Sequence, residues 1–183
     1  GVAARVGGFR GVGVGCCPPA LALTGGAGML RGSPIGGGAQ NCHWEPKGAY
    51  TGEIAAPMLQ GLVRYVLVGH SERRAMFGDT EDAVRHKVEA VLRAGLSPML
   101  CVGEDLAQRE AGQTTDVVAR QVITALDGLR VDPDRLVVAY EPVWAIGTGK
   151  ACPPGTANQT CGGVVRGVLT ELGDAALGHE KER

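Results

Sequence analysis

Three short apolar runs recur along the chain, and their spacing constrains the fold more than any other feature. The runs cover residues 63–69, 96–102 and 136–140 and are rich in β-branched and large apolar side chains, as buried strands are. They end near residues 69, 102 and 141, which are 33 and 39 residues apart. That distance leaves room for a helix in each right-handed crossover between parallel strands. The pattern therefore predicts an α/β chain with a parallel sheet.

The segments between the runs carry helix signals. Asp79 or Thr80 can cap a helix whose apolar side chains repeat every three to four residues until Gly95 ends it. A second helix is expected from about residue 115 to residue 127. Residues 12–14 and 35–41 are weaker strand candidates, because their glycines contribute no side chain to a sheet. We therefore expect five strands.

Length and charge limit the class of protein. The 183 residues fit one domain, residues 1–183, in which residues 1–10 match no pattern and stay unassigned. A net charge of -1 gives no reason to expect a nucleic-acid partner. Residues 11–30 are uncharged over the length of a membrane span, but Pro18, Pro19 and six glycines interrupt them. We expect a soluble cytoplasmic protein that does not bind membranes.

Two cofactor signals are incomplete. The six cysteines form no C-x-x-C pair with histidines at zinc-ligand spacing, so we expect free thiols and no metal site. Residues 147–150 read GTGK, but Trp144 and Ala151 stand where a P-loop needs Gly and a hydroxyl residue. Neither a zinc site nor a P-loop is predicted.

Polar residues follow the predicted strands. Parallel sheets place ligand sites at the carboxyl ends of their strands, and those ends carry Asn41, His70, Cys101 with Glu104, and Glu141. A His and a Glu that reach one face from different strands can form an acid–base pair. A hydrogen-bonded structural imidazole and a salt-bridged carboxylate are the plainer alternatives, and the residues alone leave them open.

The segment after Glu141 has the composition of a moving loop. Residues 142–144 read PVW and stiffen one end, residues 145–149 read AIGTG, and Lys150 precedes a helix that begins at a proline. A loop of small residues with an apolar tip and stiff ends suits a lid that closes on hinges. An ordinary glycine-rich connection is the alternative.

Several strings together resemble one enzyme family. Residues 69–74 read GHSERR and residues 140–150 read YEPVWAIGTGK, and AQN at 39–41, GAYTGEI at 48–54 and CVGE at 101–104 accompany them. In this combination the chain resembles triosephosphate isomerase. The resemblance is strong over residues 38–160 and weak over residues 11–37. It implies a (β/α)8 TIM-barrel fold, represented here by a partial barrel of about five parallel βα units.

The resemblance also implies an activity: interconversion of dihydroxyacetone phosphate and D-glyceraldehyde 3-phosphate, in glycolysis and gluconeogenesis, without a metal or organic cofactor. Glu141 is then the base that moves a proton between two carbons through an enediol(ate). His70 is the neutral electrophile that polarises the carbonyl. Glu72 is a further site carboxylate, although pairing with Arg73 or Arg74 is an equal alternative.

Substrate and partner contacts follow from the same resemblance. The backbone N–H of Gly147 grips the substrate phosphate when the lid closes. Asn41 and the loop that contains Thr51 match surfaces through which one subunit reaches the other, with Thr51 near the partner's site. We therefore expect a homodimer that acts on a small triose phosphate.

The resemblance is incomplete. The five predicted strands resemble the second to the sixth of the eight strands in a barrel of about 250 residues. The family's catalytic Lys on the first strand and the phosphate loops of the last two units have no counterpart. We therefore expect the 183-residue chain alone to isomerise poorly. A truncated, catalytically dead paralogue that acts as a dimerising or binding module is the main alternative. A different phosphosugar enzyme on a similar barrel is another.

Overall fold

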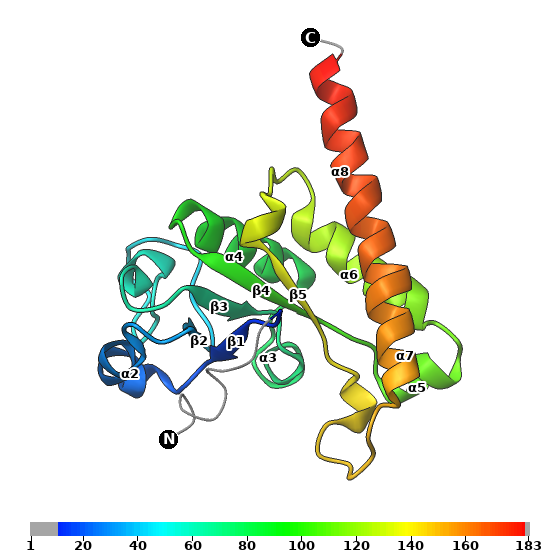
Figure 1. The fold of residues 1–183 in the computed structure, drawn as a ribbon, viewed down its shortest axis with the longest axis horizontal. Coiled ribbons are helices and arrows are strands. Elements are labelled where there is room, and N and C mark those ends of the chain that lie inside the picture. The colour runs from blue at the N-terminus through cyan, green and yellow to red at the C-terminus, as the bar shows by residue number, and fades with distance from the viewer. Residues whose placement is uncertain (1–10, 182–183) are drawn as a thin grey trace. The chain divides into compact units, whose positions relative to one another are not determined.

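A computed structural model describes residues 11–181 of the chain; the unassigned residues 1–10 lie outside the described part. It contains five strands: β1 (Val14–Cys16), β2 (Ile35–Ala39), β3 (Tyr65–Val68), β4 (Ser97–Val102) and β5 (Val137–Tyr140). They form one sheet in chain order (Figure 1). β2 pairs in parallel with β1 and with β3, with Val14 opposite Ile35 and Gly38 opposite Tyr65. The prediction of a parallel α/β sheet with five strands is confirmed.

The helices lie in the connections between strands and after β5. In chain order they are η1 (Ala20–Ala22), α2 (Leu23–Leu30), η2 (Ala56–Leu59), α3 (Ser71–Met76), α4 (Glu81–Arg93), α5 (Leu106–Glu110), α6 (Thr114–Leu126), η3 (Pro133–Arg135), η4 (Val143–Ala145), α7 (Pro154–Gln159), η5 (Thr160–Val165) and α8 (Arg166–Lys181). α4 and α6 are the two predicted helices, and α7 begins at a proline as expected. α3 and α5 are short helices that the apolar pattern does not reveal.

The described residues divide into two compact units. The first comprises residues 11–68, 86–99 and 133–137. Its buried side chains include Ile35 of β2, Val66 of β3, Leu59 of η2, and Val88 and Val91 of α4. Arg135 fastens the end of α4, because its guanidinium donates to the carbonyl oxygens of Leu92 at 3.0 Å and Leu96 at 2.8 Å.

The second unit comprises residues 69–85, 100–132 and 138–181. The buried face of α6 contributes Val117, Val118, Val122, Ala125 and Leu126 to its apolar core. α6 lies against η5 and α8, which continue the helix that starts at α7 (Figure 1). η5 is a π-helical turn that contains Gly162 and Gly163. Every side chain of the candidate acid–base site lies in this unit.

Candidate active site

Glu141 and His70 face each other in the second unit. Glu141 is the first residue after β5, and its backbone N–H donates to the Val102 carbonyl at 2.8 Å. His70 lies two residues after β3 and is the N-cap of α3. The Nε2 atom of His70 is 3.2 Å from Oε2 of Glu141, and their side chains are 31% and 15% exposed. The two residues that the strand ends indicated are therefore in contact, and both remain partly exposed.

The imidazole of His70 is oriented by the helix that it caps. The backbone N–H of Glu72 donates to Nδ1 of His70 at 3.3 Å, so Nδ1 acts as an acceptor and carries no proton. The proton of the neutral ring is then on Nε2, the atom that faces Glu141. This tautomer can donate a hydrogen bond into the site while the ring stays uncharged.

Ser71 holds the Glu141 carboxylate in place. Its backbone N–H donates to Oε1 at 2.6 Å, and its hydroxyl donates to Oε2 at 3.3 Å. Burial raises the pKa of Glu141 above its ordinary value of 4.5, while His70, Ser71 and Arg74 act in the opposite direction. The net effect is a carboxylate with increased affinity for a proton, as a general base needs.

The backbone before Glu104 and around Glu141 is closely packed. A Cβ atom at Gly103 would overlap the carbonyl oxygen of Glu141, so only glycine fits there. The buried amide of Gln121 fixes the same residue, accepting from the Gly103 N–H at 2.8 Å and donating to its carbonyl at 3.3 Å. These contacts fix the position of the backbone that holds Glu141 in the site.

Glu104 is a fully buried carboxylate, with 0% of its surface exposed. It accepts hydrogen bonds from the hydroxyl of Tyr140 at 3.0 Å, the indole Nε1 of Trp144 at 3.0 Å and the hydroxyl of Thr114 at 3.2 Å. Burial, together with the charge and hydrogen bond of Glu104, raises the pKa of Tyr140 to about 12. Trp144 lies in η4 at the start of the predicted lid, so Glu104 anchors that end.

The rest of the predicted lid is exposed and bends at two glycines. Gly147 and Gly149 have φ angles of +69° and +74°, which favour glycine. The hydroxyl of Thr148 donates to the carbonyl oxygens of Trp144 at 3.1 Å and Ala145 at 3.2 Å. The loop thus has internal hydrogen bonds and two glycine bends, which suits a lid that moves as one body.

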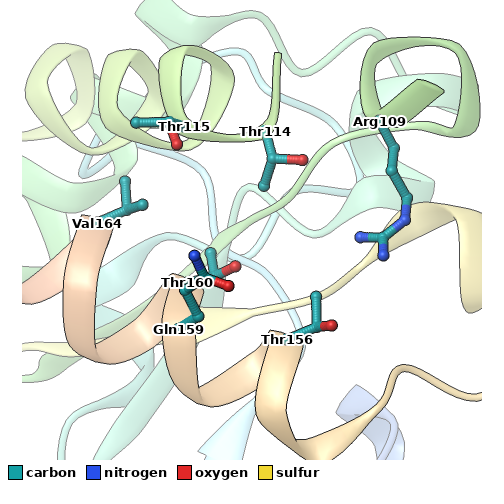
Figure 2. Close-up of a pocket in the computed structure, with 7 residues that line it drawn as sticks. All are labelled: Arg109, Thr114, Thr115, Thr156, Gln159, Thr160 and Val164. Carbon is teal, nitrogen blue, oxygen red and sulfur yellow. The ribbon is translucent and has the colours of Figure 1, made fainter. Parts of the chain in front are cut away.

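A polar cavity of about 350 Å³ opens beside Thr114, which donates a hydrogen bond to Glu104 (Figure 2). Side chains of α5, α6, α7 and η5 line it: Arg109, Thr114, Thr115, Thr156, Gln159, Thr160 and Val164. Among the residues that the structure describes, no group of three or more His, Cys, Asp or Glu side chains is placed to hold a metal ion.

Glu72, another predicted site residue, lies at the margin of the Glu141–His70 contact. The side chain of Glu72 is 59% exposed, with Oε2 3.9 Å from Nδ1 of His70. Its alternative partners are engaged elsewhere, because Arg73 pairs with Asp79 at 3.1 Å and Arg74 pairs with Glu81 at 3.0 Å.

Two other candidates belong to the first unit. Asn41 accepts a hydrogen bond from the buried Lys87 at 3.0 Å. Thr51 is exposed in the loop before η2. Cys101, which the strand-end pattern also selected, is buried in β4.

Comparisons with known proteins and structures give one consistent result. The family model for triosephosphate isomerase matches residues 2–178. The chain belongs to the triosephosphate isomerase family. Its similarity to the triosephosphate isomerase of Dehalococcoides mccartyi is 49% identity over 160 residues, or 87% of this chain and 62% of the relative. Its similarity to that of Moorella thermoacetica is 51% identity over 158 residues, or 85% of this chain and 63% of the relative.

A solved structure supports the same family. The crystal structure of triosephosphate isomerase from Bartonella henselae matches with a TM-score of 0.72 at 40% identity, covering 78% of this chain and 60% of that chain. The predicted membership of a TIM-barrel family is therefore confirmed. The chain spans about 62% of the length of the curated relatives that it matches. Within residues 11–181, no helix has the length and apolar character that crossing a membrane requires.

Proposed function

We propose that this chain supplies the acid–base site of a triosephosphate isomerase, which interconverts dihydroxyacetone phosphate and D-glyceraldehyde 3-phosphate. The observation that carries the proposal is the 3.2 Å contact between Oε2 of Glu141 and the Nε2 atom of a His70 whose Nδ1 accepts a hydrogen bond. A base and a neutral hydrogen-bond donor at one place are what proton transfer next to a carbonyl needs.

The two side chains have distinct roles in the proposed reaction. Glu141 removes a proton from the carbon beside the substrate carbonyl, while the Nε2–H of His70 donates to the carbonyl oxygen as negative charge develops there. Glu141 then returns the proton to the neighbouring carbon of the enediol(ate). To reach the substrate, the carboxylate must leave the hydrogen bonds that Ser71 donates to it at 2.6 and 3.3 Å.

The loop after Trp144 is the proposed lid. Its closure would bring the N–H of Gly147 onto the substrate phosphate and exclude water, which protects the intermediate from losing phosphate. Glu72 is proposed as a further carboxylate of the site, acting from the first turn of α3 beside His70. The alternative of a catalytically dead binding module has less support, because the carboxylate and the imidazole that the proposal needs are both present and in contact.

We also propose a homodimer formed through the loop that contains Thr51, with Asn41 at its base. Exposed Thr51 and the 44% exposed Tyr50 support this surface, and the ring of Tyr50 lies 4.3 Å from that of His43, which gives the loop internal structure. Sedimentation velocity would test it: Thr51→Arg should shift the protein to monomer, whereas an unchanged sedimentation coefficient would refute this surface. We further propose that the protein is cytoplasmic and that residues 1–183 form a single domain.

A chimera tests the proposed chemistry. Residues 38–160 of this chain would replace the matching segment of the Moorella thermoacetica relative, and isomerisation would be followed in a coupled assay. We expect the chimera to be active, Glu141→Gln to abolish most turnover, and Glu110→Gln, a change at an exposed carboxylate of α5, to have no effect. A folded chimera without activity, or an active Glu141→Gln variant, would refute the proposal.

A further inference from the structure

Arg109 makes two contacts at the start of the lid that the proposed chemistry does not use. Its guanidinium lies 4.1 Å from the centre of the Trp144 ring. Its NH1 atom lies 3.5 Å from Oε1 of Glu104, the oxygen that accepts the hydrogen bond of the Trp144 indole. Arg109, Glu104 and Trp144 therefore form a closed set of contacts, which we call the hinge clamp.

The hinge clamp fixes the indole in two directions. The hydrogen bond from Nε1 to Glu104 sets the edge of the ring, and the guanidinium of Arg109 covers one face. The carboxylate and the indole are shielded from water, because Glu104 is fully buried and Trp144 is only 8% exposed. Shielding strengthens both the cation–π contact and the charge-assisted contact.

One side of the Arg109 guanidinium borders the polar cavity. In Figure 2 the guanidinium extends from α5 toward the cavity, across from Thr156. The cavity side of the group is thus open space lined by hydroxyls, and the side chain of Arg109 is 31% exposed. Tight packing therefore does not determine the position of the guanidinium; its contacts with Trp144 and Glu104 do.

We propose that Arg109 is a positioning residue for the lid, which it serves by holding Trp144 as a fixed hinge. This inference rests on the proposed isomerase function only in assigning a purpose to the lid. The contacts of the hinge clamp can be tested without measuring turnover. With Trp144 held, movement is confined to residues 145–150, whose glycines at 147 and 149 have φ angles of +69° and +74°. Without Arg109, Trp144 moves as well, and the lid no longer closes along one defined path.

The guanidinium is suited to this role in a way that an ammonium group is not. It is planar, so it stacks on the indole face while its edge donates toward a carboxylate. Lysine can supply the charge but not the stacked plane. A role in positioning therefore predicts graded behaviour, with Arg109→Lys between the wild type and Arg109→Met, whereas a simple charge contribution predicts that lysine restores the full effect.

The test uses the 183-residue chain with Trp44→Phe, which leaves Trp144 as its single tryptophan. Acrylamide quenching of Trp144 and amide hydrogen exchange of residues 145–150 would be measured for wild type, Arg109→Met and Arg109→Lys. Arg120→Met is the matched control, because Arg120 is an exposed arginine on α6. Far-UV circular dichroism would establish that each variant is folded.

We expect the Trp144 quenching constant and the exchange rates of the lid amides to rise about threefold in Arg109→Met, with an intermediate rise in Arg109→Lys and no rise in Arg120→Met. If Arg109→Met does not fold, the intermediate response of Arg109→Lys decides. Unchanged quenching and exchange in the folded Arg109 variants, or full restoration by lysine, would overturn the inference. An inactive chimera would count against the isomerase proposal alone.

Discussion

The indole Nε1 of Trp144 donates a hydrogen bond at 3.0 Å to Oε1 of Glu104, a carboxylate with no exposed surface. A buried charge is tolerated only when its neighbours satisfy it, and Tyr140, Thr114 and Arg109 complete the set. The stability of the second unit and the anchoring of the lid thus depend on the same carboxylate.

Glu104→Gln should destabilise the protein strongly. The amide has the size of the carboxylate, but it loses the charge that balances Arg109 and offers N–H groups to neighbours that are themselves donors. Each buried donor that is left without an acceptor costs about 1–3 kcal/mol. Urea unfolding followed by circular dichroism would measure the loss in the free energy of unfolding. Glu110→Gln, at an exposed position of α5, is the control. A loss for Glu104→Gln no larger than that of the control would contradict this account.

Gly103→Ala should also destabilise, for a steric reason. The added methyl group would overlap the carbonyl oxygen of Glu141, so the backbone of β4 or β5 must shift. Gly167→Ala in α8 is the matched control, because its Cβ meets no atom within 4 Å. In the control, alanine should stabilise the helix by about 0.5–1 kcal/mol. Thermal unfolding of both variants should therefore show shifts of opposite sign; shifts of the same sign would disprove the assigned packing.

The parts of the fold that follow from periodicity could be predicted from the sequence. α4 shows why boundaries are harder: either Asp79 or Thr80 could cap it, and the structure uses Thr80, whose hydroxyl accepts from the Ala83 N–H at 3.1 Å. Asp79 pairs with Arg73 instead. The short helix α5 has no apolar repeat, yet Asp105 and Gln108 form a capping box that the sequence does contain.

The site also contains residues that the sequence predicts and residues that it does not. His70 and Glu141 could be selected because strand ends meet at one edge of a parallel sheet. Ser71 and Arg109 could not, because each acts through a contact with a residue 70 or 35 positions away in the sequence, Glu141 and Trp144 respectively. Periodicity and strand order say which elements are neighbours, but not which side chains meet across them.

The stability of the protein should depend on the protonation of Glu141. Its pKa is raised in the folded state, so between its ordinary value of 4.5 and the raised value the folded state holds a proton that the unfolded state has released. The contribution of Glu141 to the free energy of unfolding is therefore complete below the ordinary pKa and is lost as pH rises through the raised value. Glu141→Gln removes this dependence.

Urea titrations at about pH 4 and about pH 7.5 would measure the effect. Relative to wild type, the free energy of unfolding of Glu141→Gln should be higher at the higher pH than at the lower pH. Glu110→Gln again serves as the control. A difference that stays constant, or moves in favour of the wild type, would show that burial does not dominate the environment of Glu141.

Glu141→Asp tests the placement of the proposed base. Aspartate keeps the charge but is one methylene shorter, so its oxygens draw back from the position 3.2 Å from His70 that the glutamate reaches. Misplacing a reacting group by about 1 Å costs on the order of a hundredfold in rate, whereas binding through the lid and the phosphate does not involve this carboxylate. In the active chimera, kcat should therefore fall at least about a hundredfold, while KM changes by less than about threefold. Glu110→Asp in the same chimera is the comparison, because Glu110 is an exposed carboxylate of α5 that the proposed site does not use. Equal kcat values for Glu141→Asp and wild type would exclude Glu141 as the base, since a proton transfer that tolerates the shorter side chain cannot depend on where this carboxylate lies.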